Sequence, residues 1–352
     1  MRVKLKDITK FSKGTQINGK NLIDDGAYSY LNGGINPSGK WNEFNVAENT
    51  VTISEGGNSS GYVNYMNDAF WCGAHCYYLY DGPKNSKYLY YALKSQQERL
   101  FRIRSGACMP NIKKSDLGNF IIEYEKDEVR QEEVVKVLEK CELLIEDYNK
   151  KLTLLDEAVR ARFVEMFGDP VINSCQFPVQ PMTDICDIID GDRGKNYPKS
   201  EEILDDGYCL FLNAKNVTQK GFDFENCNFI TREKDDALRN GKLSRGDVVL
   251  TTRGTVGNLA YYSKNVPYEN IRINSGMVIL RMNRSILNEI YFIELFKMKL
   301  SDIKEKIASG SAQPQLPIST MNKIILMIPP LELQNQFASF VQEIDKSRSR
   351  IQ

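Results

Sequence analysis

The stretch "SGACMPNIKKSDLGNFII", from Ser105 to Ile122, returns later in the chain as "SGSAQPQLPISTMNKIIL", from Ser309 to Leu326. The two stretches align without a gap and keep glycine, proline and apolar residues at matching places. A long recurrence of this kind is the signature of a repeated structural unit. The sequence therefore predicts that the chain of 352 residues contains two similar domains.

Earlier parts of the chain support the same duplication. Three further pairs of segments occur in the same order in both halves: "LKDITKFSKG" from Leu5 with "MTDICDIIDG" from Met182, "YLNGG" from Tyr30 with "FLNAK" from Phe211, and "TVTISEGG" from Thr50 with "DVVLTTRG" from Asp247. In each half, short β-like stretches alternate with glycine turns and helical stretches. We therefore expect an α+β fold with two similar α/β domains.

A long helix is predicted between the two copies. No glycine or proline occurs from Asp127 until Gly168 and Pro170, and apolar residues recur at alternating steps of four and three, as in a coiled-coil seam. A second amphipathic helix is expected to follow Pro329 and Pro330. We expect the two helices to form an antiparallel coiled coil, with Val134, Leu138, Ile145, Tyr148, Leu152 and Leu155 of the first helix facing Leu333, Phe337, Phe340 and Ile344 of the second.

These elements divide the chain into four parts. The expected parts are a first domain at 1–126, a spacer helix at 127–170, a second domain at 171–330 and a C-terminal helix at 331–352. The last helix is much shorter than the spacer helix, so it is either truncated or naturally short. The alternative arrangement is that each helix docks only on its own domain.

Composition and motifs argue against an enzyme. Lys plus Arg and Asp plus Glu both total 46, so the net charge is zero and only a local basic surface could attract nucleic acid. The chain has one histidine, no N/D-P-P-Y/F stretch of an amino-methyltransferase and no Ser-His-Asp or Cys-His pair on a suitable spacing. "WCGAHC", from Trp71 to Cys76, lacks a second pair of ligands, so no metal site is expected.

The stretch "GTQINGK", from Gly14 to Lys20, looks like a phosphate-binding loop, which would indicate a nucleotide-hydrolysing enzyme. Asn21 stands where Ser or Thr would hold magnesium, and the second copy does not keep the glycine spacing. This hypothesis is therefore disfavoured. No apolar run approaches the ~18 residues of a membrane helix, and the N-terminus does not read as a secretory signal. We expect a cytoplasmic protein with reduced cysteines.

The ordered set of segments resembles the specificity subunit of type I restriction–modification systems. The resemblance is carried by the duplicated domains and by "RFVEMFGDP" (Arg162–Pro170), "VVLTTRGTVGN" (Val248–Asn258) and the stretch from Ser309 to Asp345. It implies that each domain is a target-recognition domain that reads one half of a split sequence in double-stranded DNA. It also implies that the helices dock two methyltransferase subunits and that restriction subunits join through the complex. S-adenosylmethionine, ATP and Mg are then expected on partner subunits, and no cofactor or catalytic residue is expected in this chain.

The turn from Thr251 to Asn258 is the best candidate for DNA contact, because hydroxyls can bond phosphates and an arginine can pair with phosphate or guanine. In the joint before the second helix, Gln313 could bond adenine. The other candidates occupy matching places in the first copy, recur in both copies or add local positive charge. The complete set is Lys13, Lys20, Asn32, Ser54, Asn58, Ser59, Arg104, Lys195, Asn213, Lys215, Thr251, Thr252, Arg253, Thr255 and Gln313.

Each of these candidate residues could instead have an ordinary structural role. The hydroxyl-rich turn could be a hairpin with solvated side chains, Asn32 and Asn213 could cap local structure, and the basic residues could lie on a solvated face. At the level of the whole chain, the alternative function is a coiled-coil scaffold with two protein-binding modules and no affinity for DNA.

Overall fold

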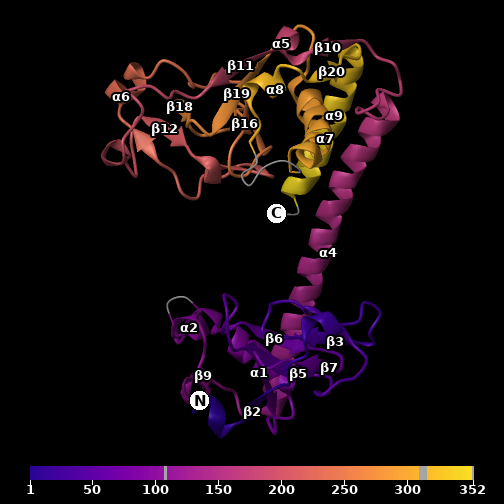
Figure 1. The fold of residues 1–352 in the computed structure, drawn as a ribbon, viewed down its shortest axis with the longest axis vertical. Coiled ribbons are helices and arrows are strands. Elements are labelled where there is room, and N and C mark those ends of the chain that lie inside the picture. Colours follow the sequence, from indigo (N-terminus) through magenta and orange to yellow (C-terminus); the bar gives the residue numbers. More distant parts are fainter. Residues whose placement is uncertain (107–108, 309–314, 351–352) are drawn as a thin grey trace. The chain divides into compact units, whose positions relative to one another are not determined.

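The computed structural model describes residues 1–106, 109–308 and 315–350, and of residues 301–308 it describes the backbone (Figure 1). The chain folds as two compact units, Met1–Asp147 and Tyr148–Gln352. The expected boundaries, which treat the spacer helix as a separate part, stay a prediction. No helix in the described ranges is long and apolar enough to cross a membrane.

Unit 1 contains two main sheets. The first is antiparallel, with the order β2 (Lys10–Lys13), β8 (Cys76–Tyr80), β5 (Thr50–Ser54) and β6 (Val63–Met66). The second has the order β4 (Gly39–Trp41), β3 (Tyr28–Leu31) and β7 (Phe70–Cys72). The remaining strands are β1 (Arg2–Lys4) and β9 (Ile121–Glu123), which pair, and the helices are α1 (Ser86–Lys94), α2 (Gln97–Arg102) and α3 (Lys114–Asn119).

Unit 2 contains the corresponding sheets. Its antiparallel sheet has the order β11 (Cys186–Asp190), β19 (Met277–Met282), β16 (Val248–Thr251) and β17 (Leu259–Tyr261), and its smaller sheet has the order β15 (Phe229–Ile230), β12 (Cys209–Leu212) and β18 (Ile271–Ile273). The other strand pairs are β10 (Val179–Pro181) with β20 (Ile325–Met327), and β13 (Val217–Thr218) with β14 (Gly221–Phe222). The helices are α5 (Met182–Ile185), α6 (Arg232–Ala237), α7 (Glu289–Ala308), α8 (Ile318–Met321) and α9 (Leu331–Ser349).

The two units share one topology, which confirms the predicted duplication. In the antiparallel sheet of each unit, the strand that comes first in the sequence pairs with the strand that comes last. These pairs are β2 with β8 and β11 with β19. In both, the smaller sheet contains one parallel pair, β3 with β7 and β12 with β18. A further short antiparallel pair precedes the long helix of each unit, β1 with β9 and β10 with β20. The α+β fold class is therefore confirmed.

A buried glutamine begins both long helices in the same way. In α4 (Glu128–Phe167), the Gln131 side-chain amide donates to the Glu125 carbonyl oxygen at 2.7 Å, and in α9 the Gln334 amide donates to the Pro329 carbonyl oxygen at 2.8 Å. Both side chains are almost fully buried. Each amide therefore fixes the direction in which its helix leaves the strand before it, because a buried polar group must keep its hydrogen-bond partners.

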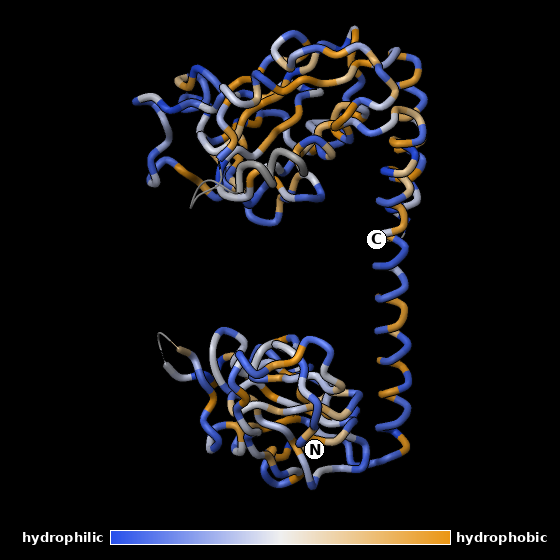
Figure 2. The backbone as a smooth tube through the Cα atoms, turned by 45° about the vertical axis from the view of Figure 1, so that its right-hand side comes forward, coloured by the Kyte–Doolittle hydropathy of each residue, from blue (hydrophilic) through white to orange (hydrophobic). Residues whose placement is uncertain are grey.

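Helix α4 has 40 residues without a break, as predicted, and hydrophilic and hydrophobic residues alternate along it (Figure 2). Its last turns pack in unit 2 against α7 and α9. The Phe163 ring lies 5.4 Å from the Phe337 ring and stacks on the Tyr291 ring at 5.6 Å, measured between centroids. Arg348, late in α9, pairs with Asp156, which precedes Phe163 in α4, so the two helices run antiparallel.

The α9 residues of the predicted seam lie in the core of unit 2, whereas the pairing of Leu152 and Leu155 with α9 stays a prediction. Leu152 and Leu155 are partly buried, and Leu333, Phe337, Phe340 and Ile344 of α9 all join the core of unit 2. Val134, Ile145 and Tyr148 are exposed, by 42%, 61% and 43%, and so do not form the expected seam, whereas Leu138 is half-buried. The start of α4 instead meets α1 through polar contacts such as Tyr91 with Glu142, which heptad spacing does not reveal.

We predict that Phe163→Ala destabilises unit 2 by about 3–5 kcal/mol, because the ring is fully buried among three other aromatic rings and its loss leaves a cavity. Denaturant unfolding of the whole chain, followed by hydrogen exchange to report each unit separately, would measure this change. Val164→Ala is the matched control, since Val164 is the next residue and is 43% exposed. An equal loss in the two variants would contradict the packing described above.

Candidate nucleic-acid interface

The hydroxyl-rich turn between β16 and β17 is held together by its own threonines. The Thr251 hydroxyl donates to the Thr255 carbonyl oxygen and accepts from the Asn258 backbone N–H at 2.9 Å. The Thr252 hydroxyl donates to the Gly276 carbonyl oxygen at 3.0 Å. Both side chains are buried. The expectation that they contact DNA is therefore corrected: their hydroxyls already have backbone partners within the protein, and both residues leave the candidate interface.

The same turn exposes Arg253, Gly254 and Thr255. Gly254 has a φ of +73°, in the left-handed region that favours glycine, so the chain reverses directly beside Arg253. The Arg253 backbone N–H donates to the Gly276 carbonyl oxygen at 3.2 Å. Within the described ranges, no hydrogen bond or ion pair engages the Arg253 guanidinium. The turn thus presents a fixed backbone with a free cationic side chain.

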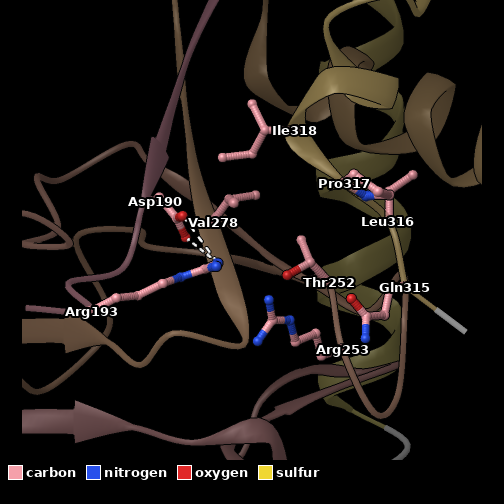
Figure 3. Close-up of a pocket in the computed structure, with 9 residues that line it drawn as sticks. All are labelled: Asp190, Arg193, Thr252, Arg253, Val278, Gln315, Leu316, Pro317 and Ile318. Carbon is pink, nitrogen blue, oxygen red and sulfur yellow. Dashed lines mark hydrogen bonds and ion pairs between the residues drawn. The ribbon is translucent and has the colours of Figure 1, made fainter. Parts of the chain in front are cut away.

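Arg253 shares a small pocket with a second arginine. The pocket has a volume of ≈ 250 Å³ and is also lined by Asp190, Arg193 and Gln315 (Figure 3). Nη2 of Arg193 lies 3.0 Å and 3.1 Å from the two carboxylate oxygens of Asp190. Since Asp190 neutralises one arginine, the pocket keeps about one net positive charge, which suits an electronegative group.

A second hollow is lined by other residues of the same turn. It has a volume of ≈ 750 Å³ and is lined by Lys215, Lys220, Thr255 and Asn258, among others. The Asn258 side chain donates to the Val217 carbonyl oxygen at 2.9 Å and so ties the turn to the hairpin of β13 and β14, which follows Lys215 and carries Lys220. The turn thus borders two hollows that both contain exposed cations, the kind of surface that a DNA backbone requires.

The remaining candidates of unit 2 divide between exposed and structural positions. Lys195 and Lys215 are exposed, whereas Asn213 caps the short turn Ala214–Asn216 by accepting from the Lys215 backbone N–H at 2.9 Å. Asn213 therefore follows the capping alternative. Gln313 lies outside the residues that the structure describes. Sequence reasoning did not identify the nearby Gln315. It lies beside Arg253 because a β-bridge joins the two residues, and no local sequence motif indicates such a bridge.

Unit 1 uses its candidate residues mainly to build the matching turn. The Ser54 hydroxyl is buried and donates to the Gly33 carbonyl oxygen, and the Ser59 hydroxyl donates to the same oxygen at 2.6 Å. Asn32 accepts from the His75 backbone N–H at 3.2 Å. These three side chains have structural partners, so the expected DNA contacts of Ser54, Ser59 and Asn32 are corrected in the same way as those of the threonines.

The basic candidates of unit 1 lie closer to the surface. Lys20 and Asn58 are exposed, and Arg104 is half-exposed, stacks on the Phe101 ring at 4.7 Å and donates to the Phe101 carbonyl oxygen at 2.7 Å. Lys20 belongs to a 3-10 turn, Gly19–Asn21, capped by Asn18. A phosphate-binding loop opens an α-helix, and this turn does not, so the structure also disfavours nucleotide binding here.

Lys13 belongs to a charge cluster that sequence reasoning missed. Its Nζ donates to one Glu55 carboxylate oxygen at 2.6 Å, and His75 Nδ1 lies 3.4 Å from the other. The three residues come from β2, the turn after β5 and the loop before β8, so only the fold brings them together. Burial, with a smaller contribution from the Glu55 charge, raises the pKa of the neighbouring Tyr77 to about 12.

Glu55 and Thr252 occupy the same place in the two units. The Glu55 backbone N–H donates to the His75 carbonyl oxygen at 2.8 Å, and the Thr252 N–H donates to the Gly276 oxygen at 2.9 Å. The carbonyl oxygen of Glu55 accepts from the Ile112 N–H at 2.9 Å, and that of Thr252 accepts from the Leu316 N–H at 3.1 Å. The described residues contain no group of His, Cys, Asp and Glu that could hold a metal ion.

Comparisons with known proteins point in one direction. A family model described as "Type I restriction modification DNA specificity domain" matches residues 1–155 and 177–352. A protein of Mycoplasma genitalium named as a type I specificity subunit is 28% identical over 95% of this chain and 84% of its own length. One of Mycoplasma pneumoniae is 26% identical over 97% of this chain and 88% of its own length.

A solved structure shows the same fold. The S subunit of a type I restriction-modification system from M. genitalium superposes with a TM-score of 0.63 at 22% identity, covering 100% of this chain and 90% of that chain.

The specificity subunit of a type I restriction enzyme from Methanocaldococcus jannaschii is 28% identical over 74% of this chain and 62% of its own length.

We predict that Thr251→Val lowers the free energy of unfolding of unit 2 by about 1–3 kcal/mol, because a buried N–H and a carbonyl oxygen lose their partner. Thr255→Val is the control: Thr255 is exposed, so the change should stay within about 0.5 kcal/mol. Equilibrium unfolding of both variants measures the difference. If Thr251→Val were as stable as Thr255→Val, the threonine would not hold the turn.

Proposed function

Because this chain belongs to the family of type I restriction–modification DNA specificity proteins, we propose that it recognises a specific sequence in double-stranded DNA through the exposed turns that follow β5 and β16. Specificity subunits are non-catalytic components of restriction–modification systems, in keeping with the expectation that the chain is not an enzyme. The finer assignments below rest on the geometry of the two turns.

The free guanidinium of Arg253 is the observation that carries this proposal. A side chain that reads DNA must be at least partly exposed, must keep unused donors or acceptors and must stand on a backbone that does not move. Arg253 meets these conditions, because the turn is closed by Thr251 and Thr252 and not by its own side chain. Arginine pairs through two hydrogen bonds with O6 and N7 of guanine in the major groove. We therefore assign Arg253 to a guanine in the half-site that unit 2 reads.

The lysines beside the turn are assigned to the DNA backbone. Lys215 and Lys220 line the hollow next to Thr255, and Lys195 is exposed in the loop after β11. Flexible ammonium groups suit phosphates, which fix the position of a protein on DNA without reporting its sequence. In unit 1, Lys20 and Arg104 would serve the same purpose, with Asn58 at the matching turn.

Two units with one topology and different side chains at the same place suit a bipartite target. We assign one half-site to each unit, with α4 as the spacer between the two readers. The partners expected from the family are two methyltransferase subunits, with restriction subunits joining through the complex. These partners would supply S-adenosylmethionine, ATP and Mg. Exposed apolar side chains of α4, such as Leu143 and Leu144, are candidates for the methyltransferase contact.

We predict that Arg253→Ala relaxes sequence preference at one position of one half-site, with a loss of about 1–3 kcal/mol of discrimination. Selection of bound sequences from a random duplex library, with the methyltransferase subunits present, measures the change. Arg232→Ala is the control, since Arg232 is also exposed in unit 2 but lies over the Tyr208 ring, outside both hollows.

Three other results would change the proposal. An equal loss for every duplex would make Arg253 a phosphate contact. Unchanged binding would remove it from the interface. No enriched sequence for the wild-type complex would favour a protein scaffold without DNA recognition.

A further inference from the structure

The two equivalent turns carry opposite chemistry. In unit 2 the turn places the free guanidinium of Arg253 at the surface, whereas the matching residue of unit 1 is Gly56, which has no side chain. The match follows from two β-bridges, one between Arg253 and Gln315 and one between Gly56 and Asn111. One residue earlier, unit 2 has the buried Thr252 and unit 1 has Glu55, whose side chain is 15% exposed. The turn of unit 2 thus carries a cation and the turn of unit 1 carries a carboxylate, at adjacent and not at identical positions.

The Glu55 carboxylate is fixed but not fully used. Lys13 holds one oxygen at 2.6 Å and His75 approaches the other at 3.4 Å, with these two side chains 43% and 61% exposed. A carboxylate offers about four acceptor positions, so each oxygen keeps one for a further donor. Its orientation is set from both sides, which is the preorganisation that a reading group needs.

A carboxylate at this place restricts what it can meet. It repels a phosphate, so in a turn that faces DNA it is favourable only against a base edge that donates a hydrogen bond. In the major groove, the exocyclic amines of cytosine and adenine are the donors, and carboxylates pair with N4 of cytosine. Arginine in the matching turn of unit 2 requires acceptors instead.

We propose that Glu55 is a specificity-determining residue of unit 1 and that it accepts a hydrogen bond from the exocyclic amine of a base, cytosine N4 in the first instance. Lys13 and His75 act as positioning residues for its carboxylate. This inference rests on the proposed function, because it assigns the base that the first of the two readers requires. It also gives a chemical reason why the two half-sites differ.

The test is selection of bound duplexes by the complex of the chain with its methyltransferase subunits, for wild type and for Glu55→Gln. An amide both donates and accepts, and it pairs with N6 and N7 of adenine. We expect Glu55→Gln to change the preferred base at one position of one half-site, from cytosine toward adenine, by about tenfold or more. The other half-site should not change. If the wild type already prefers adenine at that position, the donor is adenine N6. Glu55→Ala should then weaken the preference for adenine at the same position.

Two further variants separate this role from a structural one. Lys13→Met removes an ion pair and leaves the carboxylate, so it should weaken binding without changing the preferred base. Glu43→Gln is the matched control, because Glu43 is an exposed glutamate of the same unit and should bind as wild type. Thermal unfolding verifies that each variant is folded. If Glu55→Gln does not fold, Glu55→Asp replaces it in the test. This variant keeps the charge and shortens the side chain, so it should lose the base preference at the same position.

The outcomes distinguish this inference from the proposed function. A folded Glu55→Gln complex that selects the wild-type sequence would overturn the role of Glu55 and leave the DNA reader intact. A uniform loss of affinity for all sequences would also overturn it and would make the cluster a phosphate contact. Failure of the wild-type complex to select any sequence would overturn the proposed function itself.

Discussion

One backbone hydrogen bond in each unit connects the turn that follows β5 or β16 to the chain that enters the next helix. It runs from the Ile112 N–H to the Glu55 carbonyl oxygen in unit 1 and from the Leu316 N–H to the Thr252 carbonyl oxygen in unit 2. Ile112 and Leu316 are both buried in the core of their unit. The bond therefore couples three features: the shape of the turn, the packing of the core and the path of the chain toward α4 or α9.

Much of this organisation follows from the sequence alone. The ungapped recurrence beginning at Ser105 and Ser309 predicts the duplication, because a repeated unit must bury the same positions twice. The unbroken stretch from Asp127 predicts the long helix, which the structure places at Glu128–Phe167. The extent of the seam could not be predicted, because heptad spacing shows which face is apolar and not which neighbour covers it. The contribution of α7, through Tyr291, depends on tertiary packing.

The candidate site was predictable in position but not in its parts. The turn from Thr251 to Asn258 was located from its glycines and hydroxyls, yet a sequence does not show whether a hydroxyl points into a turn or toward solvent. Thr252 bonds to Gly276, 24 residues away, and Lys13 bonds to Glu55, 42 residues away. Such partners are set by strand pairing in the antiparallel sheets, so Glu55, His75 and Gln315 came to light only with the fold.

The separation of bonds that hold the turn from side chains that face outward has an evolutionary consequence. The same backbone hydrogen bonds keep the shape of the turn in both units, although the side chains differ, with Arg253 in place of Gly56 and Thr252 in place of Glu55. A substitution of the exposed Arg253 is therefore expected to cost little stability. The exposed side chains of the turn can therefore vary between related proteins while the strands, turns and helices that carry them stay the same.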